Sequence, residues 1–419
     1  MSERNPHILF INEFYWPDVC ASAAVFTDHL PKIAAARPDW RISVLTGDRA
    51  WDGPHVRWPS EERHGAIEVH RVRHGPVRRT LHARAYGFAR FHLAAVRRGR
   101  GLDRPDVVVA TTAPPAGARI GLAVSHHHRC PMIYKVYDLY PDCAEALQII
   151  RPGGWVAGSW EHSDRAAMHQ AQSIVAISHR MAERIVHHRG LSPAKVECIH
   201  DGFDAARLEQ AQPDAFRREH RLEGRFVVQY AGNMGLSHPF DTILGAAAKL
   251  SHQPDVAFQL IGAGPARKRV ESALRERPLP VQLLDYQPAE RLGDLLASAD
   301  VGLVSQNPAM SELSLPYKVY GLMAAGKPAI FIGDARSEIA DWYRTHDCGI
   351  HIAQGDVDGL VRAILRIKND PLDARRLSDN ARRVFAERFD SRVAVRKWIE
   401  SIEDLLPGRE HRDHSGQLF

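Results

Sequence analysis

Short apolar runs alternate with amphipathic segments along most of the chain. The apolar runs of the first half lie at 7–11, 40–45, 106–110, 132–136, 173–177 and 196–199. Those of the second half lie at 226–230, 257–261, 281–284, 301–304, 329–332 and 349–352. Continuous apolar runs of this length are typical of strands that are buried on both faces of a parallel sheet. The alternation therefore predicts an α/β protein with doubly wound parallel sheets.

The length of the chain and the restart of this pattern indicate two domains. At 419 residues the chain is too long for one compact core. We expect an N-terminal domain over 1–205, a C-terminal domain over 206–390, a helix over 391–405 and a disordered polar tail over 406–419. In the second half, periodic segments predict helices at 241–250, 292–297, 317–325, 357–367 and 378–389.

The composition is that of an ordinary globular enzyme, with 44% hydrophobic and 25% charged residues. No apolar run reaches the roughly 18–20 residues that span a bilayer, and the first residues lack the apolar segment of a signal peptide. We therefore expect a cytoplasmic protein.

The cysteines and histidines show no spacing that is typical of a metal site. The five cysteines are scattered and never form CxxC, which argues against a disulfide framework and against structural zinc. The 24 histidines form no HExxH motif, and we interpret the triplet at 126–128 as a solvated basic loop. These patterns predict no bound metal.

Positive charge is concentrated between Arg71 and Arg104, where ten arginines accompany one acid, Asp103. Apolar and aromatic residues recur among these arginines at helical spacing. A basic amphipathic helix suits an anionic membrane surface or a pyrophosphate-bearing lipid, so we expect peripheral contact with the inner face of the cell membrane. A helix that packs on the core and exposes a solvated basic face is the alternative. Nucleic acid is not expected, because the aromatics are spaced for packing rather than as a stacking platform.

The stretch 305–328 carries the strongest chemical signal. It follows an apolar strand and becomes a helix in whose first turn Lys318 lies. A lysine is unfavourable beside the positive end of a helix dipole and therefore needs another partner. We interpret that partner as a nucleotide phosphate, because loops at the carboxyl ends of parallel strands bind such anions. An ordinary solvated lysine is the alternative.

Glycine clusters and one acid follow other strands. Gly232, Gly262 and Gly264 come directly after apolar runs, where a tight turn and a bound phosphate both need a bare backbone. The pair Gly262 and Gly264 is a weak signal alone, because it lacks the third glycine of a dinucleotide fingerprint. Asp138 follows the strand at 132–136 and is our candidate for a catalytic or acceptor-binding acid. The alternative role of a helix cap fits Asp142 better.

The ordered set of segments resembles a known family. The matching segments, spread over about 7–390, are FYWPD, TTAPP, KVYDLYPD, VAISHRM, IHDGFD, YAGNMG, LIGAGP, ASADVGLVS and LPYKVYGLMAAGKP. In this order they resemble the retaining GT-B glycosyltransferases of family 4, in the WbuB-like subgroup of O-antigen and capsule sugar transferases.

This resemblance implies two facing Rossmann-like domains with a cleft between them. The first would bind the acceptor, the second the nucleotide-sugar donor, and the last helix would cross back to the first domain. The implied reaction is transfer of a hexosyl or N-acetylhexosaminyl group from a nucleoside diphosphate sugar, expected to be UDP-linked, to a hydroxyl. The acceptor would be a lipid-linked or cell-surface glycan intermediate in polysaccharide biosynthesis. The family retains the anomeric configuration and uses neither metal nor cofactor.

The resemblance also implies roles for individual residues. Tyr286 and Gln287 would hold the nucleobase, and Lys318 would stabilise the leaving diphosphate while Asp138 orients the acceptor. The other residues implied in the nucleotide-sugar site are Ser22, Gly232, Asn233, His238, Gly262, Gly264, Ser314, Pro316, Tyr317 and Gly321.

The sequence departs from the wider family at several of these positions. Leu313 and Gly321 replace a pair of glutamates, with Glu312 one residue away, and Asn233 and His238 replace an arginine and a lysine. The family's histidine after the strand at 132–136 is also missing, because Tyr137 takes its position beside Asp138. The WbuB-like subgroup is similar in these losses. The missing glutamates keep a non-catalytic nucleotide-sugar-binding subunit open as one alternative. A GT-B-fold nucleotide-sugar epimerase is a second alternative, against which the YDLYPD and TTAPP segments argue.

Overall fold

The computed structural model describes residues 5–18, 20–50, 53–73 and 81–407. Most of the tail expected to be disordered, and the first arginines of the expected basic helix, lie outside these ranges. Contacts divide the chain into two units, Met1–Asp201 with Ser391–Phe419 and Gly202–Asp390. The chain first passes from unit 1 to unit 2 after Asp201, slightly before the expected boundary at 205. The helix expected at 391–405 belongs to unit 1.

Unit 1 contains one sheet with the strand order β10-β9-β8-β7-β1-β2-β6-β5. Its strands are β1 (His7–Ile11), β2 (Arg41–Gly47), β5 (Glu61–His64), β6 (Ile67–Val72), β7 (Val107–Thr111), β8 (Met132–Val136), β9 (Ser173–Ala176) and β10 (Val196–Cys198). All neighbours are parallel except β5 and β6. The short β3 (Arg49–Ala50) and β4 (Gly53–Arg57) form a separate antiparallel pair.

The region from β3 to β6 has no counterpart among the strands predicted from the sequence. Glu61–His64 consists of three charged residues and a histidine, and β6 alternates apolar with polar side chains over most of its length. This pattern fits strands at a sheet edge that are covered on one face only. A search for continuous apolar runs therefore does not detect them.

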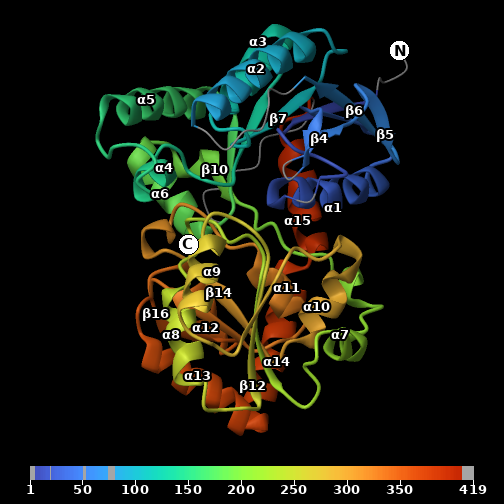
Figure 1. Cartoon of the computed structure of the whole chain (residues 1–419). Helices are drawn as coiled ribbons and strands as arrows, with labels where there is room; N and C mark the ends of the chain where they lie inside the picture. Colours follow the sequence, from blue (N-terminus) through green and yellow to red (C-terminus); the bar gives the residue numbers. More distant parts are fainter. Residues whose placement is uncertain (1–4, 19, 51–52, 74–80, 408–419) are drawn as a thin grey trace. The chain divides into compact units, whose positions relative to one another are not determined.

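Helices accompany the strands of unit 1. They include α1 (Ala21–Ala36), α2 (Leu81–Arg100), α3 (Ala118–His128), α4 (Asp142–Ala146), α5 (Trp155–Gln170), α6 (His179–Arg189) and α15 (Ser391–Glu403). Although α1 and α15 lie at opposite ends of the sequence, they pack side by side, as the blue and red helices in Figure 1 show. Trp398 of α15 is fully buried, with its ring centroid 6.4 Å from Phe10 and 6.2 Å from Phe26. The last helix thus completes the core of unit 1.

Buried polar groups hold the segment at which the chain leaves unit 1. Lys135 is inaccessible to solvent and forms a 2.8 Å ion pair with Asp201. Its ammonium also donates to the carbonyl of Ile199 at 3.1 Å. His29 Nε2 lies 2.8 Å from the Asp201 carbonyl, and burial lowers the pKa of His29 to about 4. The imidazole is therefore neutral and donates its Nε2–H. Because a buried charge needs its partner, these contacts fix residues 199–201.

Unit 2 contains a fully parallel sheet with the order β13-β12-β11-β14-β15-β16. Its strands are β11 (Phe226–Ala231), β12 (Val256–Ile261), β13 (Val281–Leu284), β14 (Val301–Ser305), β15 (Ala329–Gly333) and β16 (Ile350–Ala353). The α-helices of this unit are α7 (Pro213–Glu219), α8 (Asp241–Lys249), α9 (Arg267–Glu276), α10 (Leu292–Ser298), α11 (Lys318–Ala324), α12 (Glu338–His346), α13 (Val357–Asn369) and α14 (Pro371–Val384).

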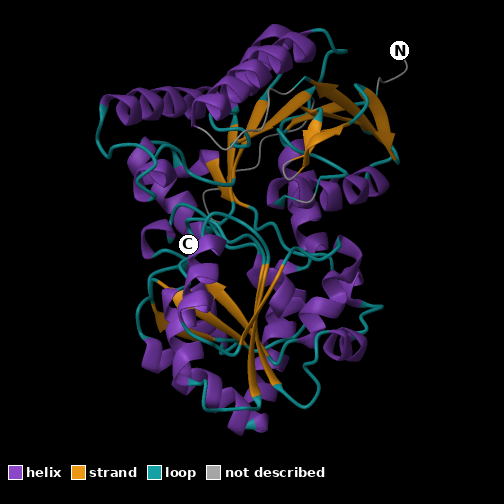
Figure 2. Ribbon diagram, viewed as in Figure 1, coloured by secondary structure: helices purple, strands orange, loops and turns teal. Residues whose placement is uncertain are grey.

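Both faces of this sheet are covered. Adjacent residues on one strand belong to different hydrophobic clusters: Leu303 packs with the cluster that includes α8 and α13, and Val304 with the cluster that includes α11 and α12. Side chains alternate across a strand, so each face has its own helical layer. Figure 2 shows the orange strands of this unit with purple helices on both sides. The prediction of doubly wound parallel sheets is confirmed.

One predicted helix boundary is wrong. The helix expected at 378–389 begins at Pro371 and ends at Val384, where a π-helical turn (Phe385–Phe389) continues it. The Asp370 side chain accepts hydrogen bonds from the backbone N–H groups of Leu372 and Asp373. Proline at the first helical position after such a cap is a recognised start signal. The sequence therefore contained the correct boundary at Asp370–Pro371.

Candidate functional site

The strand order of unit 2 reverses direction at β11. From β11 the chain adds β12 and β13 on one side, and then β14, β15 and β16 on the other. Loops that follow β11 and β14 must therefore diverge, and α/β sheets bind ligands at such a switch point. The loops that begin at Gly232, Gly262 and Gln306 follow β11, β12 and β14. We call Gly232–Gly235 with Gly262–Gly264 the glycine-loop cluster.

The two loops of the glycine-loop cluster touch backbone to backbone. The φ angles of Gly232, Gly262 and Gly264 are 135°, 136° and 143°, values that residues with a side chain rarely adopt. A Cβ atom on Gly262 would lie 2.0 Å from the carbonyl oxygen of Gly232. The Met234 amide donates to the Ala263 carbonyl at 2.8 Å. Glycine is thus required for the two loops to approach each other, which is a different reason from the turn and the phosphate considered in the sequence.

Lys318, the first residue of α11, reaches this cluster. Its ammonium donates to the Tyr230 hydroxyl at 2.7 Å and lies 4.2 Å from the Tyr230 ring centroid. Tyr230 in turn donates to the Asn233 carbonyl at 2.7 Å. A Cβ atom on Gly232 would lie 3.0 Å from Lys318 Cε, so the lysine stem runs directly beside that glycine. The structure therefore brings Gly232, Asn233 and Lys318 together.

The electrostatics of Lys318 favour an anionic ligand. Removal from water lowers the pKa of its ammonium to about 7, and no carboxylate of the described residues offsets this effect. Tyr230 supplies only a hydroxyl and the face of a ring. A cation that is desolvated without a counter-ion gains strongly when an anion binds beside it.

His238 lies near this lysine but adds no positive charge. Its Nδ1 is 2.7 Å from the carbonyl oxygen of Ser305 in β14. Burial and the charge of Lys318 lower the pKa of His238 to about 3, so the ring is neutral and Nδ1–H is the donor. Lys318 is therefore the cation that these contacts place beside the loop after β11.

Tyr286 follows β13 and lies beside the second glycine loop. Its hydroxyl is 3.5 Å from the Ala263 carbonyl oxygen, and the residue is 46% exposed. The Gln287 side chain donates to the Asp285 carbonyl at 3.1 Å, which leaves it in the same loop. These positions are consistent with a surface on which a planar ring can stack.

Two supporting residues were not predicted from the sequence. Arg267 at the start of α9 donates to the carbonyls of Gly262 (2.6 Å) and Leu284 (2.8 Å), which ties the ends of β12 and β13 together. Buried Gln306 donates to the carbonyls of Met310 and Ser314, at 3.1 Å and 2.9 Å, and so shapes the loop before α11. Both act on backbone atoms, for which a sequence contains no pattern.

The other predicted site residues in α11 and in the loop before it differ in how far they are buried. Pro316 is buried, and Tyr317 packs its ring 6.5 Å from Phe203. Gly321 faces the core, because a Cβ atom there would lie 3.1 Å from Leu296 Cδ1. The structure does not bring Gly321 to the glycine-loop cluster. A carboxylate at this position would need to leave an apolar environment or remain buried at a high cost.

Asp138 and Ser22 belong to unit 1. The amides of Tyr137 and Asp138 donate to Thr112 Oγ1 at 3.0 Å and 3.3 Å, which fixes the chain after β8. Burial raises the pKa of the Asp138 carboxyl to about 6. Ser22 lies in the first turn of α1, where its Oγ is 3.7 Å from Cys20 Sγ. A carboxyl with a pKa close to neutrality is suited to exchange hydrogen bonds with a hydroxyl.

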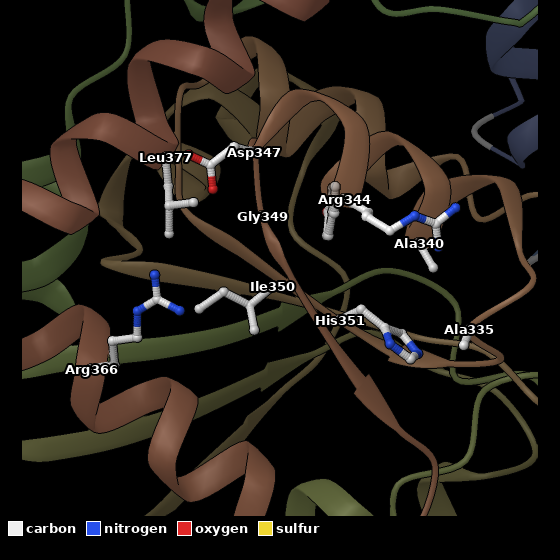
Figure 3. Close-up of a pocket in the computed structure, with 10 residues that line it drawn as sticks. Ala335, Ala340, Arg344, Asp347, Gly349, Ile350, His351, Arg366 and Leu377 are labelled. Atoms are coloured by element: carbon white, nitrogen blue, oxygen red, sulfur yellow. The ribbon is translucent and has the colours of Figure 1, made fainter.

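A cavity of about 320 Å³ lies elsewhere in unit 2, along the edge strand β16 (Figure 3). Arg344 and Arg366 line it, together with His351. Each arginine pairs with an aspartate, Arg344 with Asp341 and Arg366 with Asp373. Because β16 is the outer strand and β11 an inner one, this cavity is separate from the glycine-loop cluster. Its charges are already neutralised, so we do not assign the site to it.

The sequence matches two protein families. Glycosyltransferase Family 4 matches residues 34–207, and Glycosyl transferases group 1 matches residues 212–384. The chain is a family 4 glycosyltransferase. The second match spans the glycine-loop cluster and Lys318.

Known relatives of this glycosyltransferase cover most of its length. WcaI of Escherichia coli, which is named as a colanic acid biosynthesis glycosyl transferase, is 24% identical over 358 residues, 82% of this chain and 86% of WcaI. Sucrose-phosphate synthase of Thermosynechococcus elongatus has a similar structure, with a TM-score of 0.76, 16% identity and coverage of 96% of this chain and 99% of the synthase. HepE of Anabaena, solved with UDP and glucose, has a TM-score of 0.69 and 16% identity, with coverage of 96% and 100%. These similarities confirm the GT-B fold.

In the described residues of the glycosyltransferase, every helix is too short or too polar to cross a membrane.

Proposed function

We propose that this glycosyltransferase moves a sugar from a UDP-linked donor to a hydroxyl of a lipid-linked or cell-surface glycan, with retention of anomeric configuration. The observation that carries the proposal is the desolvated ammonium of Lys318 beside the glycine-loop cluster. HepE has been solved with UDP and with UDP-glucose, and WcaI is named for colanic acid biosynthesis. A WbuB-like subgroup is part of this proposal, as is a hexosyl or N-acetylhexosaminyl group.

In the proposed donor site, the diphosphate lies against the backbone of the glycine-loop cluster. The bond between the anomeric carbon and the phosphate oxygen breaks, and negative charge develops on the leaving diphosphate. Lys318 and backbone amides stabilise that charge, so the site supplies a positive countercharge without a metal. Tyr286 and Gln287 would flank the nucleobase. Ser314, Pro316 and Tyr317 would form the wall before α11.

In the proposed acceptor step, a hydroxyl oxygen bonds to the anomeric carbon on the face that the diphosphate leaves. The proton of that hydroxyl passes to an oxygen of the leaving phosphate, so no separate base is required. Asp138 accepts a hydrogen bond from the acceptor and orients it, since its carboxyl is largely ionised at neutral pH. Ser22 would approach the donor from the small-residue turn at the start of α1.

One feature favours a second candidate, a non-catalytic nucleotide-sugar-binding subunit. Leu313 is buried and Gly321 faces the core, so the positions of the family's two glutamates carry no carboxylate. Such a subunit would bind nucleotide and never release product. An epimerase would turn over the donor without any acceptor. Assaying donor consumption with and without a membrane lipid extract therefore separates all three functions.

Thermal unfolding with UDP, GDP, TDP and ADP tests the donor site. We expect UDP to raise the melting temperature most, because a ligand that binds only the folded state stabilises it by mass action. At a hundredfold excess over Kd the stabilisation is about 2.7 kcal/mol. Replacing Lys318 with methionine should abolish the shift, whereas replacing Lys249, which pairs with Asp358, should not. If no nucleotide stabilises the wild type, the donor-site proposal is wrong.

The pKa of Lys318 predicts a pH dependence for donor binding. A bound diphosphate favours the ammonium and raises its pKa above the value of about 7 in the free protein. Binding therefore takes up a proton wherever the free lysine is neutral. The Kd for UDP-glucose should be constant below about pH 6 and rise by up to about tenfold per pH unit above pH 7. Calorimetry in two buffers of different ionisation enthalpy measures this uptake, which Lys318→Met should remove.

Contact with an anionic membrane is proposed for one face of α2. Phe91 and Ala95 are buried, whereas Arg90, Leu93 and Arg97 lie on the other face, with Leu93 77% accessible. Tyr86, 58% accessible, lies one turn before Arg90. The helix therefore packs on the protein and still presents basic and apolar groups outward. This arrangement combines the two interpretations that the sequence left open.

Vesicle flotation tests this contact. We expect binding to phosphatidylglycerol vesicles at low salt and little binding to phosphatidylcholine. Leu93→Ser should weaken binding by about tenfold or more, because burying a leucine is worth about 1.5–3 kcal/mol. Leu236, another exposed leucine, offers a matched control in unit 2. Equal binding of Leu93→Ser and wild type would contradict the proposed contact.

A further inference from the structure

Three side chains that can bind metal converge in unit 1, apart from the glycine-loop cluster. The ligand atoms of His179, Cys198 and His200 all lie within 4.8 Å of one another. Cys198 Sγ is 3.7 Å from Nε2 and 3.9 Å from Nδ1 of His200. The two imidazole centroids are 5.4 Å apart. We call these residues the His-Cys-His cluster.

The parallel sheet brings this cluster together. Strands β9 and β10 are parallel neighbours, with Cys198 opposite Ala176. Cys198 ends β10, and His179 is the first residue of α6, shortly after β9. His200 follows Cys198 by two residues, so both point to the same side of an extended segment. All three side chains therefore lie at the carboxyl edge of the sheet, where the loops are free to bind ligands.

The backbone around the His-Cys-His cluster is held in place. Lys397 of α15 donates to the Cys198 carbonyl at 3.3 Å. The contacts of Lys135 with Ile199 and Asp201 fix the chain on either side of His200. Cys198 is 7% exposed, whereas both histidines are partly accessible. The site is thus preorganised, and an ion can still enter from solvent.

The geometry fits a tetrahedral zinc site. Zinc bonds of about 2.05 Å to nitrogen and about 2.3 Å to sulfur imply an N···S separation of about 3.6 Å at a tetrahedral angle. His200 can bind an ion through only one ring nitrogen, and its Nε2 lies 3.7 Å from Cys198 Sγ, close to this value. One thiolate with two imidazoles suits a borderline ion such as Zn²⁺ and not Mg²⁺ or Ca²⁺, which prefer oxygen ligands.

We propose that His179, Cys198 and His200 bind one Zn²⁺ ion and that the fourth position is open to water. Binding replaces the Cys198 S–H bond with a Zn–S bond, and the thiol proton passes to the buffer. The proposal stands apart from the donor site, since its ligands lie in unit 1 and its test needs no nucleotide.

Metal titration of the full-length, tag-free protein tests the site. Zn²⁺ binding is measured by equilibrium dialysis after treatment with a chelator, and Co²⁺ serves as a spectroscopic probe. We expect about one tight Zn²⁺ per chain and, with Co²⁺, a thiolate-to-metal charge-transfer band together with tetrahedral visible bands. Zn²⁺ should also raise the melting temperature of the metal-free protein.

Variants identify the ligands. Cys198→Ala should remove the charge-transfer band. His179→Ala or His200→Ala should weaken Zn²⁺ binding by at least about 10- to 100-fold, because losing only a residue that hydrogen-bonds to a metal ligand already has an effect of this size. Cys130→Ala and His127→Ala are controls: Cys130 is a partly accessible thiol elsewhere in unit 1, and His127 belongs to the histidine triplet.

A variant that fails to fold is recognised by its melting temperature without metal, and His200→Asn then replaces His200→Ala. Unchanged Zn²⁺ affinity in Cys198→Ala, no thiolate band with Co²⁺, or loss of binding in His127→Ala would each overturn the proposal.

Discussion

Lys318→Met is expected to lower kcat/KM for sugar transfer by about 10²- to 10³-fold, the usual cost of removing one group that stabilises developing charge. Methionine keeps most of the apolar stem beside Gly232 but removes the ammonium that contacts Tyr230. The fall in kcat/KM therefore measures the effect of the missing positive charge and not of lost packing. Release of UDP from a UDP-sugar, with a membrane lipid extract as acceptor, measures the rate.

The two kinetic constants distinguish the roles of this lysine. If Lys318 contacts phosphate both in the bound donor and during departure of the diphosphate, KM rises and kcat falls. A rise in KM with kcat unchanged would show that Lys318 acts only in donor binding. Lys249→Met, which removes a surface lysine of the same unit, should leave both constants unchanged. Transfer within about threefold of wild type in Lys318→Met would contradict the phosphate role.

Gly262→Ala is expected to weaken UDP binding by about 10- to 100-fold. The new Cβ atom would lie 2.0 Å from the Gly232 carbonyl oxygen, and the φ angle of 136° is strained for alanine. Backbone strain of this kind costs about 1–3 kcal/mol. Where the strain raises the free energy of the UDP complex, each 1.4 kcal/mol weakens UDP binding tenfold. The two loops must separate, so the diphosphate surface is lost. Calorimetric titration with UDP measures the change.

Gly355→Ala separates the clash from the strain. Gly355 also has a positive φ, 94°, but no atom lies within 4 Å of the position that an alanine methyl group would take there. We expect Gly355→Ala to lower the melting temperature slightly and to leave the Kd for UDP unchanged. If Gly262→Ala binds UDP as tightly as Gly355→Ala does, the backbone contact between the loops is not part of the donor site.

The parallel sheets and the position of Lys318 could be predicted because both depend on short-range patterns. Continuous apolar runs identified the central strands. The position of Lys318 in the first turn of a helix indicated that it needs another partner; the structure shows the Tyr230 hydroxyl, and the anion stays a prediction. The edge strand β5 and its neighbour β6 were missed because their polar residues remove that signal. The start of α14 was predicted at 378 instead of Pro371, because the helix cap at Asp370 was not considered.

Contacts between distant segments could not be predicted. The sequence shows that Gly321 replaces a glutamate, but only the packing of Leu296 shows that this position faces the core. Tyr230 was expected only as a strand residue, and its contact with Lys318 spans 88 positions. His179 and Cys198 were judged by spacing alone, which predicted no metal, whereas the register of β9 and β10 places them together.

The return of α15 to unit 1 also concerns the order in which the protein is made. Unit 2 is complete once the ribosome has passed Asp390, while the core around Phe10 and Phe26 still lacks Trp398. Unit 1 can therefore be completed only after the whole of unit 2 has been synthesised. A nascent chain stopped at residue 390 would expose the apolar face of α1, and chaperones or proteases would recognise it there. The core of unit 1 thus depends on a segment that follows all of unit 2 in the sequence.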